Sequence, residues 1–180
     1  MQLNERKILE VGIGNKTISN YLKQFGFDVT TCDHADYLEP DYVADIRELP
    51  FSDNEFGLIL ACEILEHIPF SDVGKALSEL CRVTSKYVVI SVPYSSSYLE
   101  IMIKASFPKL WYKKKHVLLQ LPNFFIKHGE STHRWEMGKK GYSKERFRNL
   151  ITSCNLLITK EFQPIMNPAH YFFVLKKGNT

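Results

Sequence analysis

The sequence predicts an α/β fold, built on a doubly wound and mostly parallel sheet. The first observation is a strand, a glycine turn, a helix and a second strand within residues 7–33, which is typical of a βαβ unit. The second is that further strand-like runs alternate with helical segments, which favours a sheet with helices on both faces. The third is that the last two strand-like segments lie too close in sequence for a helical crossover, so we expect an antiparallel hairpin there.

The amino-terminal unit is defined by its side-chain pattern. Residues 7–13 are apolar at alternate positions and end at a glycine, as expected of a strand. Residues 17–25 carry apolar side chains at helical spacing, and Gly26 provides a stop. Residues 28–33 are rich in β-branched residues and predict the second strand. A right-handed crossover would place the two strands parallel.

The central part of the chain continues the alternation. Three strands are expected, over residues 41–45, 56–65 and 86–93. The last two are continuous apolar runs, as in strands that are buried on both faces. A helix is expected over residues 72–83, with Ser71 or Asp72 as its cap. Its apolar face consists of Val73, Ala76, Leu77, Leu80 and Cys81.

The carboxyl-terminal part supplies one more helix and the hairpin. Ser143 is placed to cap a helix, whose apolar residues are Phe147, Leu150, Ile151 and Cys154. Strands are expected over residues 156–162 and 170–177, which brings the sheet to seven strands. We therefore predict a single domain over residues 1–180, with an inserted, lid-like segment at about 94–130.

Composition limits the class of protein. The chain has 180 residues, of which 44% are hydrophobic, so one domain with a substantial core is expected. It lacks an apolar run of about 18 residues and a secretory-signal pattern. The four cysteines are widely spaced and form no Cys-x-x-Cys pair or Cys/His cluster, so the sequence predicts no metal site. We expect a reducing, cytoplasmic compartment.

Candidate ligand-binding residues follow the predicted strands, where ligands bind in open α/β sheets. Gly12 and Gly14 follow the first strand, but Lys16 stands where a dinucleotide fingerprint has its third glycine. Asp33 lies 19 positions after Gly14, close to the spacing expected of an acid that binds ribose hydroxyls. Asp45 follows the third strand, so several polar side chains are expected to share one crevice.

The order of these motifs carries a resemblance. ILEVGIGN, TTCD, VADIRELPFSDNEF, LILACEILEHI and YVVISVP occur in sequence. This arrangement resembles the class I S-adenosylmethionine-dependent methyltransferases, in particular the small type 11 kind, and the resemblance covers most of residues 7–93 and, more loosely, residues 131–177. The resemblance implies a Rossmann-like fold and methyl transfer from S-adenosylmethionine, with S-adenosylhomocysteine as product. Lys16 is then acceptable, because the glycine loop lies against a methionine group without phosphate.

The resemblance also implies roles for single residues. Asp33 would bind the ribose, Asp45 and Ile46 the adenine, Cys62 and Glu63 the methionine side, while Gly12 and Gly14 bring backbone close to the cofactor and Glu10 positions their loop. Each position also has an ordinary structural interpretation, as a cap, a turn or part of the core. Lys16 and Gly57 depart from the usual pattern of the family.

Three residues are candidates for catalysis at the acceptor. His67 follows the fourth strand, His133 precedes the last helix, and Tyr94 follows Pro93. A histidine there could remove a proton from the acceptor. The alternative is that His67 supports a turn, and Trp135 is either a pocket wall or part of the core. Glu66 is interpreted as structural.

The inserted segment contains the basic excess of the chain. Six lysines and no acidic residue lie between Glu100 and Glu130, and setting these lysines aside leaves 17 basic against 20 acidic residues. The lysines are Lys104, Lys109, Lys113, Lys114, Lys115 and Lys127, and the aromatic residues among them are Phe107, Trp111, Tyr112, Phe124 and Phe125. We expect a platform for an anionic small-molecule or carrier-linked acceptor. A weak membrane-surface contact through residues 104–127 and a solvated basic face are the alternatives, and nucleic acid is not expected.

Two other functions compete with methyl transfer. A nicotinamide-dependent oxidoreductase would need a pyrophosphate-binding turn, which the missing third glycine argues against. A non-catalytic scaffold with the methyltransferase fold, assisting a partner protein, is the other alternative. Retention of both Asp33 and Asp45 argues for the enzyme.

Overall fold

A seven-stranded sheet forms the centre of the computed structural model, which describes residues 7–107, 111–121 and 132–178. The strand order is β3-β2-β1-β4-β5-β9-β8. The strands are β1 (Lys7–Val11), β2 (Asp28–Asp33), β3 (Tyr42–Val43), β4 (Phe56–Cys62), β5 (Thr84–Pro93), β8 (Leu156–Phe162) and β9 (His170–Lys177). Strands β1 to β5 run parallel, and β9 is antiparallel to both β5 and β8. The predicted fold class and the terminal hairpin are confirmed.

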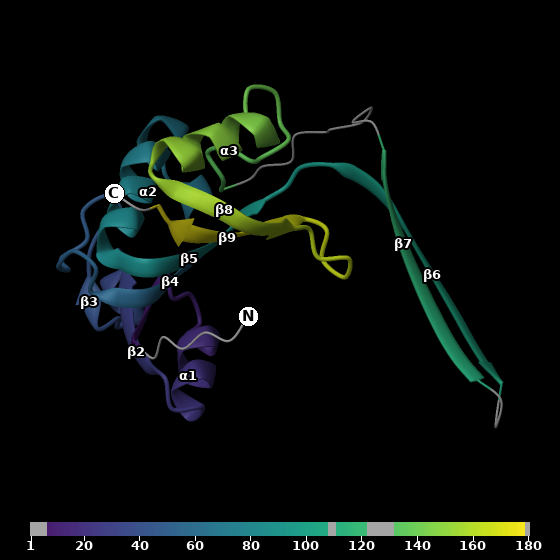
Figure 1. The fold of residues 1–180 in the computed structure, drawn as a ribbon, viewed down its shortest axis with the longest axis horizontal. Helices are drawn as coiled ribbons and strands as arrows, with labels where there is room; N and C mark the ends of the chain where they lie inside the picture. Colours follow the sequence, from purple (N-terminus) through teal and green to yellow (C-terminus); the bar gives the residue numbers. More distant parts are fainter. Residues whose placement is uncertain (1–6, 108–110, 122–131, 179–180) are drawn as a thin grey trace.

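Helices cover both faces of the sheet. They are α1 (Thr17–Gln24), α2 (Phe70–Val83) and α3 (Lys144–Ser153), with short 3-10 turns η1 (Asp36–Leu38) and η2 (Leu65–His67). Figure 1 shows α1 on one face and both α2 and α3 on the other. Among the described residues, no helix has the length and apolar character needed to cross a membrane.

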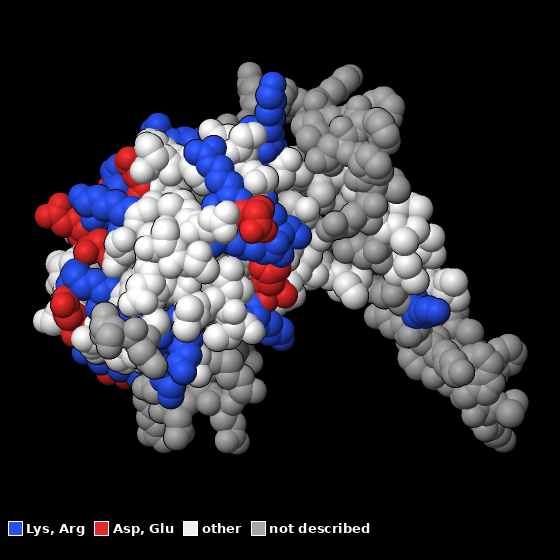
Figure 2. Space-filling view, turned by 45° about the horizontal axis from the view of Figure 1, so that its top comes forward, with Lys and Arg blue, Asp and Glu red and all other residues white. Residues whose placement is uncertain are grey.

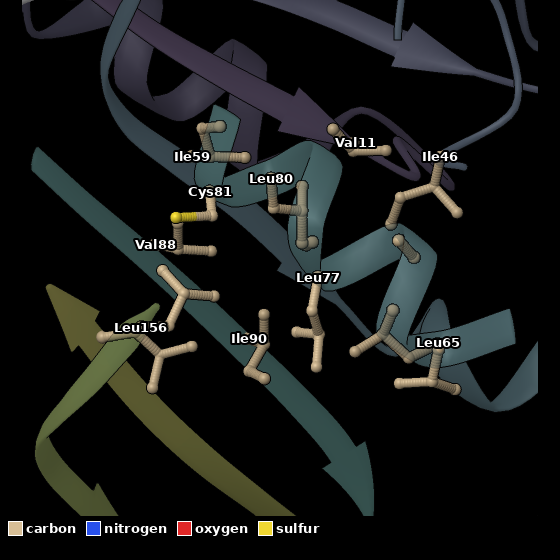
Figure 3. Close-up of a cluster of buried hydrophobic side chains, with 14 of the residues drawn as sticks. Val11, Ile46, Ile59, Leu65, Leu77, Leu80, Cys81, Val88, Ile90 and Leu156 are labelled. Carbon is tan, nitrogen blue, oxygen red and sulfur yellow. The ribbon is translucent and has the colours of Figure 1, made fainter. Parts of the chain in front are cut away.

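The main core lies between the sheet and helices α2 and α3. The predicted apolar face of α2 is buried in full, and Figure 3 shows Leu77, Leu80 and Cys81 pointing toward Val88 and Ile90 of β5. Phe147 and Ile151 bury the corresponding face of α3. This packing fixes the loops that follow β1 and β3, because Val11 and Ile46 belong to the same cluster.

Two helix starts differ in how they are capped. Ser143 caps α3 as predicted, since its hydroxyl oxygen accepts a hydrogen bond from the Arg146 amide at 3.1 Å. The predicted caps of α2 are wrong, because the helix begins at Phe70 and Pro69 occupies the cap position without a side-chain bond. Asp72 therefore lies inside the first turn of α2, where its carboxylate is free to pair with Arg47 at 2.6 Å.

Strand ends in the structure fall earlier than the apolar pattern predicts. Strand β1 ends at Val11, because Gly12 turns the chain with φ +81°. Strand β4 ends at Cys62, because Glu63 has a φ of 54° and breaks the pleat. The helix α1 is confirmed, although Ile18, Tyr21 and Phe25, three of the residues that predicted it, are exposed.

The inserted segment contains a second, two-stranded sheet. Strands β6 (Ser97–Phe107) and β7 (Trp111–Leu121) pair antiparallel along their whole length and with no other described strand. Figure 1 shows this hairpin extending away from the domain. Tyr98, Leu99 and Ile103 are exposed apolar residues on it. Lys115 is also exposed, whereas the side chains of Lys104, Lys109, Lys113, Lys114, Lys127, Phe107, Trp111, Tyr112, Phe124 and Phe125 lie outside the described residues.

Candidate functional site

A cavity of about 510 Å³ opens at the carboxyl ends of the parallel strands. It lies where the strand order reverses, since β1 has β2 on one side and β4 on the other. Its volume is typical of small-molecule sites. The lining residues are Val11, Gly12, Gly14, Asp33, His34, Ala35, Tyr37, Leu38, Ala44, Asp45, Ile46, Arg47, Cys62, Glu63, Ile64, His67 and Ile68. Seven of the eight predicted cofactor residues thus share one cavity, and Glu10 is the exception.

The glycine loop needs its unusual backbone. Gly12 and Gly14 have φ angles of +81° and +47°, in the left-handed region. A Cβ at Gly12 would also lie 2.8 Å from Ile64 Cδ1. The loop therefore packs directly against Ile64, the residue that precedes η2. Lys16, in place of the third glycine, takes a left-handed conformation as well, with φ 60°. The departure from the family pattern therefore leaves the turn intact.

Asp33 organises the end of β2. Its carboxylate is buried and accepts hydrogen bonds from the backbone amides of Ile13 and Ala35, each at 2.9 Å. These bonds tie the glycine loop to β2. His34 Nδ1 also lies 3.1 Å from Oδ1, whereas Oδ2 keeps a second acceptor position, through which Asp33 can still bind a hydroxyl group in the cavity.

Asp45 is held by an arginine that the sequence analysis did not single out. Arg47 donates to both carboxylate oxygens of Asp45, at 2.9 and 2.6 Å, and to Asp72 of α2 at 2.6 Å. The Arg47 hydrogen bonds lower the pKa of Asp45 to about 2, so the carboxylate is ionised. Arg47 thereby fixes the acid of the β3–β4 connection against α2, beside the buried Ile46.

Cys62 and Glu63, at the carboxyl end of β4, form one wall of the cavity. The Ser91 hydroxyl donates to Glu63 at 2.6 Å, and His170 Nε2 lies 3.5 Å from the other Glu63 oxygen. Burial raises the pKa of the Cys62 thiol to about 11, so this cysteine is a neutral wall residue and no nucleophile.

Glu10 lies in the sheet behind the loop. It is buried, and its Oε2 has no hydrogen-bond partner in the described part of the chain. Burial raises the pKa of its carboxyl group, while a hydrogen bond with Ser19 of α1 acts in the opposite direction. Its place agrees with an indirect, positioning role.

Two predicted acceptor-side residues come together beside the cavity. His67 of η2 lines the cavity, and the rings of His67 and His133 are 5.3 Å apart, edge to face. Burial, and next the nearby His133, lower the pKa of His67, so its imidazole is neutral near pH 7. The third candidate, Tyr94, lies outside this group: its ring packs against Tyr171 and under the Lys144 ammonium.

The segment that carries His133 is bound to η2 by several hydrogen bonds. The Arg134 amide donates to the Glu66 carbonyl at 2.8 Å, and the Trp135 indole donates to the Leu65 carbonyl at 3.1 Å. Trp135 is buried in the main core, which decides between its two interpretations in favour of the core.

Glu66 stands out in a way that the sequence did not indicate. Its side chain is fully buried, and neither carboxylate oxygen has a hydrogen-bond partner among the described residues. Burial raises its pKa to about 8. Its carboxylate, His67 and His133 have ligand atoms within 4.8 Å of one another.

Other lining residues also escaped the sequence analysis. Tyr37 and His34 are exposed residues at the rim, and nothing in their local pattern distinguishes them from ordinary loop residues. Arg47 had a usable signal, because an arginine two positions after an acid can fold back onto it. Ile64 had none, since its contact with Gly12 joins residues 52 positions apart.

The chain is similar to known methyltransferases in sequence and in fold. Residues 9–90 match the type 11 family described as a methyltransferase domain. No curated protein matches the sequence.

Solved structures with the same fold cover nearly the whole chain. A methyltransferase described as S-adenosylmethionine-dependent, from Methanosarcina mazei, is 16% identical with a TM-score of 0.62, over 100% of this chain and 95% of that one. The 1,6-didemethyltoxoflavin-N1-methyltransferase of Burkholderia thailandensis, solved with S-adenosylhomocysteine, is 14% identical with a TM-score of 0.61, over 96% and 71% of the two chains. The family match over residues 9–90 and the shared fold together support a class I S-adenosylmethionine-dependent methyltransferase.

Proposed function

We propose that the chain transfers the methyl group of S-adenosylmethionine to a small or carrier-linked acceptor that carries negative charge. The observation that supports the cofactor most directly is the acidic wall of the cavity. Asp33, Asp45 and Glu63 all line it, and the one arginine there, Arg47, is already paired with two carboxylates. This wall attracts a cofactor that carries a sulfonium and an ammonium group, and it repels the pyrophosphate of a nicotinamide dinucleotide.

The residues of the chain would act by binding and orientation. S-adenosylmethionine supplies an electrophilic methyl group, whose bond to sulfur breaks as the bond to the acceptor forms. Asp33 accepts from the ribose hydroxyls, and the ionised Asp45 accepts from the adenine amino group beside Ile46. The glycine loop brings backbone close to the methionine part. His67 and His133, next to Glu63, face the position from which an acceptor would approach. Holding the two reactants in line accounts for most of the rate that such an enzyme needs.

The acceptor is inferred from the inserted segment. The lysines between Glu100 and Glu130 give this part of the chain its positive charge. Figure 2 shows that one face of the domain carries basic and acidic side chains intermixed, so this face has no continuous patch of positive charge. The exposed Leu99, Ile103 and Lys115 of the hairpin combine apolar and basic groups. An anionic acceptor with an apolar part, free or at a membrane surface, fits this combination.

Calorimetric titration tests the cofactor. Wild-type protein is titrated with S-adenosylmethionine, S-adenosylhomocysteine and NAD under identical conditions. We expect micromolar binding of the first two and none of NAD. The variant Asp33→Ala should lose at least about tenfold in affinity, because hydrogen bonds to a charged group contribute about 1.5–3 kcal/mol each. Asp36→Ala removes an exposed carboxylate three residues away and serves as the control.

Either of two results would contradict the proposal. Undiminished affinity in a folded Asp33→Ala protein would show that the ribose lies elsewhere. No binding of any of the three compounds to the wild type would favour a non-catalytic scaffold.

A further inference from the structure

A buried carboxylate beside two histidines lies next to the cofactor cavity. Glu66 is 0% exposed, and both of its oxygens are without a hydrogen-bond partner among the described residues. His67 Nε2 is 4.0 Å from Glu66 Oε1, and His133 completes a group whose ligand atoms all lie within 4.8 Å of one another. The histidine side chains are 47% and 29% exposed, so the group is open on one side.

The surroundings of Glu66 make an empty group costly. A buried carboxyl group without a hydrogen-bond partner is unfavourable, and more so when it is ionised. The Lys139 ammonium pairs with Glu136 at 3.0 Å, and His170 Nε2 lies 3.5 Å from Glu63, so both groups contact other acids than Glu66. Among the described residues, His67 and His133 are the groups placed to bring a positive ion to Glu66.

We propose that Glu66, His67 and His133 bind a divalent metal ion of the Zn²⁺ or Mn²⁺ type. Two imidazoles and one carboxylate are a donor set that such ions accept, whereas Mg²⁺ and Ca²⁺ prefer oxygen ligands alone. With ligand bonds of about 2.1 Å, atoms around a tetrahedral ion lie about 3.4 Å apart. The three ligand atoms, which lie within 4.8 Å of one another, therefore need only small side-chain rotations to reach these distances. The hydrogen bonds of Arg134 and Trp135 to η2 hold the two halves of the site together.

The position of this metal site gives it a function at the acceptor. His67 also lines the cofactor cavity, so the ion would lie between the cofactor and solvent. Three protein ligands leave at least one coordination position open, as in catalytic metal sites. This part of the inference rests on the proposed function: the open position would take a hydroxyl oxygen of the acceptor. The ion lowers the pKa of that hydroxyl, its proton passes to solvent, and the oxygen lone pair forms the bond to the methyl carbon as the carbon–sulfur bond breaks.

Metal binding is measured directly, on untagged full-length protein stripped with a chelator. Zn²⁺ and Mn²⁺ are titrated by calorimetry, and Co²⁺ is followed by its visible absorption, which reports nitrogen and oxygen coordination. We expect one ion per chain. Glu66→Gln, His67→Asn and His133→Asn should each weaken binding at least about tenfold. His34→Asn, a histidine of the same cavity outside the group, is the matched control and should bind as the wild type does.

The outcomes separate this inference from the proposed function. Absence of Zn²⁺, Mn²⁺ and Co²⁺ binding, or binding that all three variants retain, would overturn the inference and leave Glu66 as a neutral, protonated acid. If Glu66→Gln fails to fold, His133→Asn alone decides whether this group binds the metal, because the His133 side chain is partly exposed. Titration with S-adenosylmethionine is run in parallel. Metal binding without cofactor binding would overturn the proposed function and keep the metal site. Cofactor binding without metal binding would overturn the metal site and keep the proposed function.

Discussion

Gly12 is restricted in two ways, and the two can be separated. Its φ of +81° is strained for any residue with a side chain, and its Cβ would meet Ile64 Cδ1 at 2.8 Å. We expect Gly12→Ala to lower the free energy of unfolding by about 2–4 kcal/mol, from backbone strain and overpacking together. Urea denaturation measures it.

Gly26→Ala is the matched control for Gly12. Gly26 has nearly the same φ, +78°, but nothing lies within 4 Å of a Cβ there. This variant should therefore lose only the backbone part, about 1–3 kcal/mol. The difference between the two variants reports the contact with Ile64, and Ile64→Val should reduce it. Equal losses at the two glycines would refute the close contact between Ile64 and the loop.

Glu10 predicts a pH dependence of stability. Burial raises the pKa of its carboxyl group above the usual value of 4.5, so the folded protein keeps this proton at pH values where the unfolded chain has released it. The free energy of unfolding therefore falls as the pH rises from 4.5 through the folded pKa. Glu10→Gln removes this loss, so its stability relative to the wild type should rise as the pH increases above 4.5. Each tenfold preference for the protonated form corresponds to about 1.4 kcal/mol. A pH-independent difference between the two proteins would contradict the burial effect.

Helix α3 tests the capping assignment at the level of an element. Ser143 accepts a hydrogen bond from the Arg146 amide, whereas Ser71, in a similar position by sequence, caps nothing in α2. Ser143→Ala should lower the free energy of unfolding by about 1 kcal/mol, and Ser71→Ala should change it by less than about 0.5 kcal/mol. Chemical denaturation of both variants provides the comparison. A reversal of the order would show that the predicted cap of α2 is correct after all.

The elements that could be predicted are those whose signal is local or strongly periodic. Strands β2, β8 and β9 match their predicted bounds, and the apolar face of α2 is buried as its spacing indicates. The start of α2 was missed, because Asp72 pairs with Arg47 and does not cap the helix, and this contact between residues 25 positions apart has no local signal. The hairpin β6–β7 was missed as secondary structure: no residue from Ser97 to Ile103 is buried, so this part of β6 has no alternation of buried and exposed positions.

In the site, too, residues with a local signal could be predicted, and residues that depend on distant contacts could not. Residues placed by a strand end, such as Asp33 and Cys62, fall in the cavity as expected. Ile64 was missed because its role depends on a contact between distant parts of the chain. Glu66 was set aside as structural, since only the burial of its carboxylate between η2 and the segment of His133 distinguishes it from an ordinary acid.

On the scale of the whole molecule, we predict that the hairpin is separable from the domain. Its strands pair only with each other among the described strands, and Figure 1 shows them leading away from the sheet. Replacing residues 99–119 by Asn-Gly joins Tyr98 to Gln120, which are partners in the hairpin, through a two-residue turn. We expect the shortened protein to keep the unfolding midpoint of the wild type within a few degrees, as well as its affinity for S-adenosylmethionine.

Retained cofactor affinity would assign the hairpin to the acceptor side alone, because the cavity is built from strand ends that the deletion leaves unchanged. Sedimentation with anionic and neutral lipid vesicles then separates the two forms of acceptor. Binding of the wild type to anionic vesicles, with loss in the shortened protein, would indicate an acceptor at a membrane surface. Binding by neither protein would favour a free anionic acceptor. A loss of cofactor affinity on shortening would contradict the separation of the two parts, because it would mean that the hairpin folds back to cover the cofactor.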